Sequence, residues 1–205
     1  MSEVDSKISE LSQSVSNRSM TSRLGVLVAA GLITTAVLAG PVVVDSGDTY
    51  EGNIDSRNDV VRIESGARVN GSIESRNASI TIDENAEVQD IQSRNGAVVV
   101  GSGVQAGDVS TRNGNIRIGV GAVTGTVDAR NGRITIGDGA STNRIESRNG
   151  AISVGSDVAV AGSIESRNGA IQVGSNSQVD GSLDSRNAAI SIGEATEVTG
   201  GIETR

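Results

Sequence analysis

Nine arginines recur along the chain at intervals of 18 or 19 residues. They are Arg57, Arg76, Arg94, Arg112, Arg130, Arg148, Arg167, Arg186 and Arg205. Guanidinium groups bind carboxylates and phosphates through paired N–H donors, so a regular row of them could hold an anionic ligand. Their regular spacing could equally belong to a structural repeat that presents one arginine per unit.

The residues two positions before these arginines favour the structural interpretation. Seven of the nine are acidic, and the full set is Asp55, Glu74, Gln92, Ser110, Asp128, Glu146, Glu165, Asp184 and Glu203. In the two exceptions an acid, Asp90 or Asp108, stands four residues before the arginine. Each repeat therefore carries its own countercharge, and cross-strand ion pairing explains an exposed arginine stripe better than an anion site does.

An asparagine follows eight of the arginines directly: Asn58, Asn77, Asn95, Asn113, Asn131, Asn149, Asn168 and Asn187. Asparagine tolerates left-handed backbone angles and bonds to nearby backbone groups. Stacked repeats would align the amides in a ladder in which each side chain bonds the next. We expect these asparagines, and the serine that usually precedes the arginine, to point inward or into a corner.

Other chemistry has little support in the composition. The chain has no His and no Cys, which argues against zinc, copper or haem sites and against thiol chemistry. We find no nucleophile–base pair and no phosphate-binding loop. The net charge of −8 disfavours nucleic acid as a partner. We therefore expect no enzyme activity, no cofactor, no bound metal and no small-molecule substrate.

Columns of aliphatic residues accompany the arginines. One stands three residues before them: Ile54, Ile73, Ile91, Val109, Val127, Ile145, Ile164, Leu183 and Ile202. Two more stand four and six residues after them, so they share one face of a strand. A less regular column, seven residues before, holds Tyr50, Val69, Val123, Val160, Val179 and Val198. Short strands rich in Ile and Val at this period predict an all-β, three-sided β-helix over residues 50–205, with about eight coils of 18–19 residues stacked about 4.8 Å apart.

The first 49 residues do not follow the repeat. Residues 24–44 carry no charge and, as a helix, would span roughly 32 Å, enough for a transmembrane anchor. A signal peptide with cleavage before Gly40 is the alternative. Residues 1–23 form a polar segment with an amphipathic helical pattern, and residues 45–49 a linker. Because Arg18 and Arg23 precede the apolar segment, the charge bias predicts that the N-terminus is inside and the rod outside.

The last coil suggests how the rod associates. The sequence stops at Arg205, part-way through a coil, and Val198 and Ile202 are expected at its open face. An uncovered solenoid end exposes strand edges and aliphatic side chains. We expect a homo-oligomer or homopolymer that forms through this face, tail to tail between two rods.

Residues 50–205 resemble the bactofilins, a family of polymer-forming cytoskeletal β-helix proteins. The unit that carries the resemblance is seen in VAGSIESRNGAIQVGSNSQVDGSL at 160–183, where Val-x-Gly-x-Ile, a turn and Ile-x-Val follow one another. The resemblance implies a right-handed β-helix that forms nucleotide-free filaments, often at the cytoplasmic face of membranes, and influences cell shape. The alternative, which the charge bias favours, is a membrane-anchored extracellular solenoid that acts as a surface or adhesin-like rod.

Overall fold

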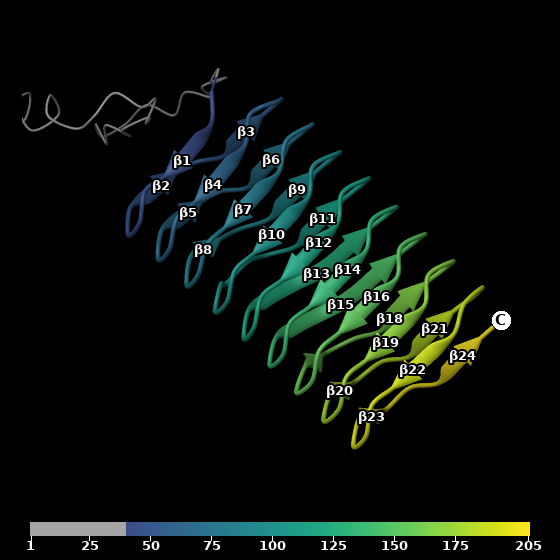
Figure 1. The fold of residues 1–205 in the computed structure, drawn as a ribbon. Helices are drawn as coiled ribbons and strands as arrows, with labels where there is room; N and C mark the ends of the chain where they lie inside the picture. The colour runs from purple at the N-terminus through teal and green to yellow at the C-terminus, as the bar shows by residue number, and fades with distance from the viewer. Residues whose placement is uncertain (1–39) are drawn as a thin grey trace, which may run out of the picture.

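The computed structural model describes residues 40–205, and these form a parallel β-solenoid (Figure 1). The coils of the solenoid build three faces from short strands, and the strands pair in parallel with the equivalent strands of the neighbouring coils. The predicted polar segment 1–23 and all but the last five residues of the predicted anchor at 24–44 lie outside the described residues.

The first face is a sheet of nine strands, one from each coil. In spatial order they are β1 (Val42–Val44), β4 (Val61–Ile63), β7 (Ile80–Ile82), β10 (Val98–Val100), β12 (Ile116–Ile118), β14 (Ile134–Ile136), β16 (Ile152–Val154), β19 (Ile171–Val173) and β22 (Ile190–Ile192). Nine strands correspond to nine coils, one more than predicted.

The second face carries the residues that precede the arginines. Its strands are β3 (Ile54–Ser56), β6 (Ile73–Ser75), β9 (Ile91–Ser93), β11 (Val109–Thr111), the second parts of β13 (Val123–Ala129) and β15 (Ser141–Ser147), β18 (Ile164–Ser166), β21 (Leu183–Ser185) and β24 (Ile202–Thr204). Here the aliphatic residue and the serine point inward, and the residue between them points outward.

The third face is shorter and less regular. Its strands are β2 (Thr49–Glu51), β5 (Arg68–Asn70), β8 (Glu87–Val88), the first parts of β13 and β15, β17 (Ala159–Val160), β20 (Gln178–Val179) and β23 (Glu197–Val198). Gln105 bridges β8 and β13 without forming a strand of its own. Because β13 and β15 run through the corner without a break, the second and third faces join into one sheet at these coils.

The rod begins earlier than the predicted boundary at residue 50. Strand β1 pairs with β4 from Val42 to Val44, and the side chains of Val42 and Val44 are buried in the core. The predicted linker at 45–49 is part of the first coil, where Asp48 N donates to Asp45 O in the turn that leads to β2. The valines at the end of the apolar segment alternate inward and outward as in the other coils, which explains why they join the rod.

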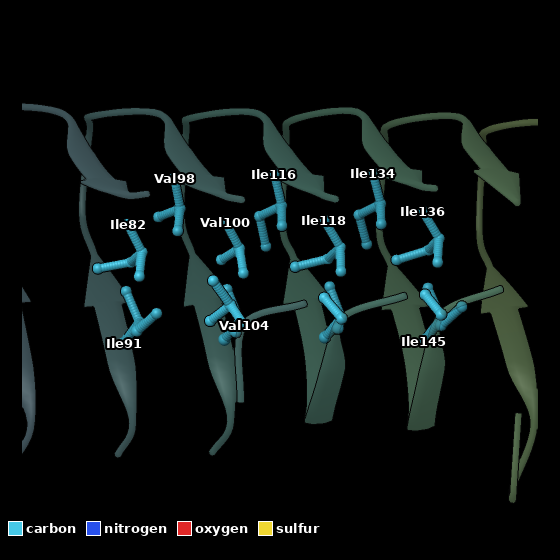
Figure 2. Packing of buried hydrophobic residues seen from close by; sticks show 14 of the residues in the cluster. Ile82, Ile91, Val98, Val100, Val104, Ile116, Ile118, Ile134, Ile136 and Ile145 are labelled. Carbon is cyan, nitrogen blue, oxygen red and sulfur yellow. The ribbon is translucent and has the colours of Figure 1, made fainter. Parts of the chain in front are cut away.

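The core is a stack of Ile and Val rows. Residues at equivalent positions lie over one another, as Ile116 does between Val98 and Ile134. Figure 2 shows these side chains turned into the interior from neighbouring coils. A residue of this kind that is almost fully removed from water contributes about 2 kcal/mol of burial free energy, which chain entropy largely offsets.

One predicted column is corrected by the structure. Val123 is 51 % exposed, and Thr124 takes the inner position instead. The coils that end at Arg94, Arg112, Arg130 and Arg148 have 18 residues and lose one residue between the third and second faces. The inner residue of the third face therefore stands six residues before the arginine in these coils and seven before it in the 19-residue coils.

Candidate functional site

The Ser-Arg-Asn segment forms the corner between the second and first faces. The serine side chain is buried and closes the turn, since Ser75 Oγ accepts from Ala78 N at 3.2 Å and donates to Ala78 O at 2.8 Å. The same contact to the residue three positions later recurs at Ser147 and Ser166. The arginine and asparagine lie on the outside of this turn and are exposed.

The predicted asparagine ladder exists, and of the two predicted positions the asparagines take the corner and not the interior. Each Nδ2 donates to the Oδ1 of the asparagine in the preceding coil at 2.6–2.8 Å, from Asn77 to Asn187, so that all eight asparagines are joined. All eight side chains lie at the exposed corner. None has a positive φ, so left-handed tolerance is not what selects asparagine here.

The residue after the asparagine turns inward in its place. In five coils this residue is glycine, and a Cβ at Gly132 would lie 1.7 Å from the carbonyl oxygen of Gly114. Glycine thus lets successive backbones stack closely at this corner. Asp59, Ala78 and Ala188 occupy the position in the three other coils.

Left-handed backbone occurs instead at the turn between the first and third faces. Its column is Gly47, Gly66, Asn85, Gly103, Gly121, Gly139, Asp157, Asn176 and Ala195, with φ between 55° and 74°. Glycine, Asn and Asp tolerate this conformation better than other residues do, and Ala195 does so at a cost. The sequence signal was present in this column of mostly Gly, Asn and Asp, but the stricter Ser-Arg-Asn repeat obscured it.

A long groove runs along the second face between two rows of charged side chains. One wall is the arginine stripe, and the other is the column two residues before it. The first half of the groove extends from Asp55 to Arg130 and the second from Asp128 to Arg186, so the two halves meet at Asp128 and Arg130. The structure therefore brings all eight arginines from Arg57 to Arg186 onto one surface.

The predicted ion pairing of the stripe is not formed. Within residues 40–205, none of the arginines from Arg57 to Arg186 has a carboxylate oxygen within 4.0 Å, and Arg205 alone in the column pairs, with Glu203. The ion pairs of the rod involve other arginines, for example Arg62 with Asp83 at 2.7 Å. An acid and an arginine two positions apart on a strand are separated by roughly 6.6 Å of backbone, and an exposed pair gains too little to hold both side chains bent together.

Asp90 and Asp108 do not serve as countercharges to the stripe either. Asp90 Oδ1 accepts from Asp108 N at 2.9 Å, and Asp108 Oδ1 accepts from Thr126 N at 2.7 Å. Each carboxylate therefore satisfies a backbone donor of the next coil at the corner between the third and second faces. Neither residue lines the groove.

The two halves of the groove differ in charge. The second half is lined by four arginines and four carboxylates, and Arg144 next to it pairs with Glu146 and Glu165. The first half is lined by five arginines and three carboxylates, because Gln92 and Ser110 replace the acid in two adjacent coils. Between these halves, burial and the neighbouring Glu146 raise the pKa of Asp128, against a smaller lowering effect of Arg144.

The predicted self-assembly face lies at the last coil. Ile202 is 52 % exposed, and Val198 is partly buried against the core. Strands β22, β23 and β24 each pair with one strand, of the preceding coil, among the described residues. Within residues 40–205, no other strand pairs with the outer edges of these three strands.

Comparisons with protein-family models, with curated proteins and with solved structures give no match for this chain. In the part of the chain that the structure describes, there is no helix long and apolar enough to cross a bilayer. Residues 40–205 also contain no cluster of three or more acidic side chains placed to hold a metal ion.

Proposed function

We propose that this chain is a non-enzymatic structural protein, similar to the bactofilins, whose rods self-assemble into polymers that scaffold the cell envelope or influence cell shape. The winding is expected to be right-handed, and the apolar residues that precede β1 would attach the polymer to a membrane. The observation that carries the proposal lies in the last described coil, where β22, β23 and β24 each pair on one side only among residues 40–205 and the side chain of Ile202 is exposed.

Burial of apolar surface would favour the association of two rods. A solenoid coil that lacks a neighbour on one side leaves part of its aliphatic cross-section and one row of backbone groups in water. This applies to Ile190, Ile192 and Val198, which are only partly buried. Their equivalents in the preceding coil, Ile171, Val173 and Val179, are nearly inaccessible. A second rod placed against this face would cover these side chains and pair the free edges.

Replacement of Ile202 by a charged residue tests the proposal. The wild-type chain should sediment as oligomers or filaments in analytical ultracentrifugation, and Ile202→Glu should shift it toward monomer without loss of its β circular dichroism. Val120→Glu is the matched control, because Val120 is 57 % exposed but lies far from the last coil. A wild-type chain that stays monomeric at high concentration and in molar salt would contradict the polymer proposal.

A surface rod is the second candidate, favoured by one sequence feature. Arg18 and Arg23 precede the apolar segment and Asp45 and Asp48 follow it, a bias that would place residues 40–205 outside the cell. Protease treatment of intact cells, followed by detection of the rod, separates the two candidates. Loss of the rod supports a surface protein, and its protection supports a cytoplasmic scaffold.

A further inference from the structure

We propose that the first half of the groove binds a linear polyphosphate, with Arg94 and Arg112 as its principal contacts. This site lies on the second face and does not depend on association through the last coil. It would give the rod an anionic ligand along its side, in addition to any contact at its end.

The excess positive charge is specific to two adjacent coils. Strands β9 and β11 pair in register, so that Gln92 lies beside Ser110, and Arg94 and Arg112 follow them at the same corner. In the six other coils of the groove the equivalent of Gln92 and Ser110 is Asp or Glu. The guanidinium groups of Arg94 and Arg112 therefore face neutral side chains, whereas their neighbours Arg76 and Arg130 face Glu74 and Asp128.

No other group within residues 40–205 neutralises this pair of arginines. Neither Arg94 nor Arg112 has a carboxylate within 4.0 Å. The nearest acids in sequence, Asp90 and Asp108, are held by backbone N–H groups of the following coils and do not line the groove. An incoming anion would meet two free guanidinium groups and displace no internal ion pair.

The geometry selects the class of anion. Equivalent side chains of neighbouring coils repeat at about 4.8 Å, so a ligand with closely spaced negative charges can contact successive arginines. The planar guanidinium matches phosphate oxygens with paired donors. A nucleic acid would gain further affinity from bases stacked on aromatic rings. The one aromatic residue of the chain, Tyr50, does not line the groove.

Restoration of the missing carboxylates is the direct test. Isothermal titration of the full chain with tripolyphosphate at low salt should show binding that weakens as salt is raised. The double variant Gln92→Glu/Ser110→Asp should bind at least about tenfold more weakly, since each new carboxylate in the groove repels the anionic ligand. Both new residues recreate the acid found in the other coils, so the fold should be retained.

The chain offers a closely matched control. Ser153 and Gln172 are also side by side in adjacent coils, but on the first face, and have the same exposure classes as Ser110 and Gln92. The variant Ser153→Asp/Gln172→Glu adds the same charge to the same residue types and should bind nearly as well as the wild type. Equal weakening in both double variants would show a general charge effect and overturn the site.

Two further outcomes would also overturn the proposal. One is the absence of tripolyphosphate binding to the wild-type chain at low salt. The other is tighter binding of polygalacturonate or of an oligonucleotide than of polyphosphate, which would assign the groove to a different polymer. Titration of the Ile202→Glu variant in parallel separates this site from assembly, because that variant should lose association and keep polyphosphate binding.

Discussion

Asn131 Nδ2 lies 2.7 Å from Asn113 Oδ1, and Asn149 Nδ2 in turn lies 2.7 Å from Asn131 Oδ1. Each amide thus donates to one coil and accepts from the next. The ladder satisfies side chains that are exposed, so its contribution to stability comes from hydrogen bonds aligned along the rod and not from burial. At its last step the ladder also reaches the backbone, since Asn187 Nδ2 donates to Arg167 O at 3.2 Å.

Asn131→Asp should lower the free energy of unfolding by about 1 kcal/mol. The aspartate can still accept from Asn149 but cannot donate to Asn113, and its carboxylate oxygen would face Asn113 Oδ1. Arg130→Ala is the control and should change stability by less than about 0.5 kcal/mol, since Arg130 is exposed and has no ion pair within residues 40–205. Chemical denaturation of both variants checks the order, and a larger loss in Arg130→Ala would contradict the role of the ladder.

Thr124→Val should stabilise the rod by about 1 kcal/mol. Among the buried side-chain polar atoms of residues 40–205, Thr124 Oγ1 has no hydrogen-bond partner, and valine fills this inner position in the coils of Val69 and Val160. Thr142→Val is the matched control, because Thr142 Oγ1 donates to Gly125 O at 2.7 Å and its loss should not stabilise. Melting temperatures of the two variants give the comparison, and equal shifts would argue against an unsatisfied hydroxyl.

Ala195→Gly should raise the free energy of unfolding by about 0.5 kcal/mol. Ala195 has a φ of 55°, which costs a residue with a Cβ about 1–2 kcal/mol, while the greater freedom of glycine in the unfolded chain offsets part of the gain. Ala189→Gly, at a position of ordinary φ six residues earlier, should be destabilising under the same urea titration. A loss of stability in both variants would show that the left-handed turn is not strained.

Asp128→Asn should stabilise the rod at neutral pH, with a gain that shrinks as the pH falls. Burial and then Glu146 raise the pKa of Asp128 in the folded state. The folded state therefore binds the proton more tightly than the unfolded state, so wild-type stability increases as the pH falls through the folded pKa toward the unfolded one. Thermal melts of both proteins across the acidic range should converge, and a constant difference would contradict this assignment.

The strict period of 18 or 19 residues was enough to predict the solenoid and most of its interior. Columns such as Ile73, Ile91 and Val109 define both the strand and its inward face, because a strand alternates sides with a period of two. The inner position of Thr124 could not be predicted. The 18-residue coils lose one residue at the corner between the third and second faces, and no single residue type stands there in every coil. Counting seven residues back from Arg130 therefore predicts Val123 as the inner residue, whereas its side chain lies outside.

The candidate site was less accessible to sequence reasoning. The alternation that places Ser93 inside was visible, but it would place Asn95 inside as well if the strand continued. The turn closed by the serine interrupts the alternation, and Asn95 stays outside while Gly96 turns inward. The pairing of arginines with acids could not be decided from spacing, because residues two apart on a strand share a face whether or not their side chains meet. Arg205 pairs with Glu203, whereas Arg186 has no carboxylate within 4.0 Å among residues 40–205.

Because the strands stack in a parallel register, duplication of a repeat would lengthen the rod. Val98 aligns with Ile116, and Ile116 with Ile134, so on the first face every coil meets its neighbours in the same register. Copying or deleting one whole repeat in the gene would preserve this register and change the length by about 4.8 Å. A single-residue insertion within a strand would instead turn its core residues toward water. The length of such a rod can therefore change only in steps of one whole repeat.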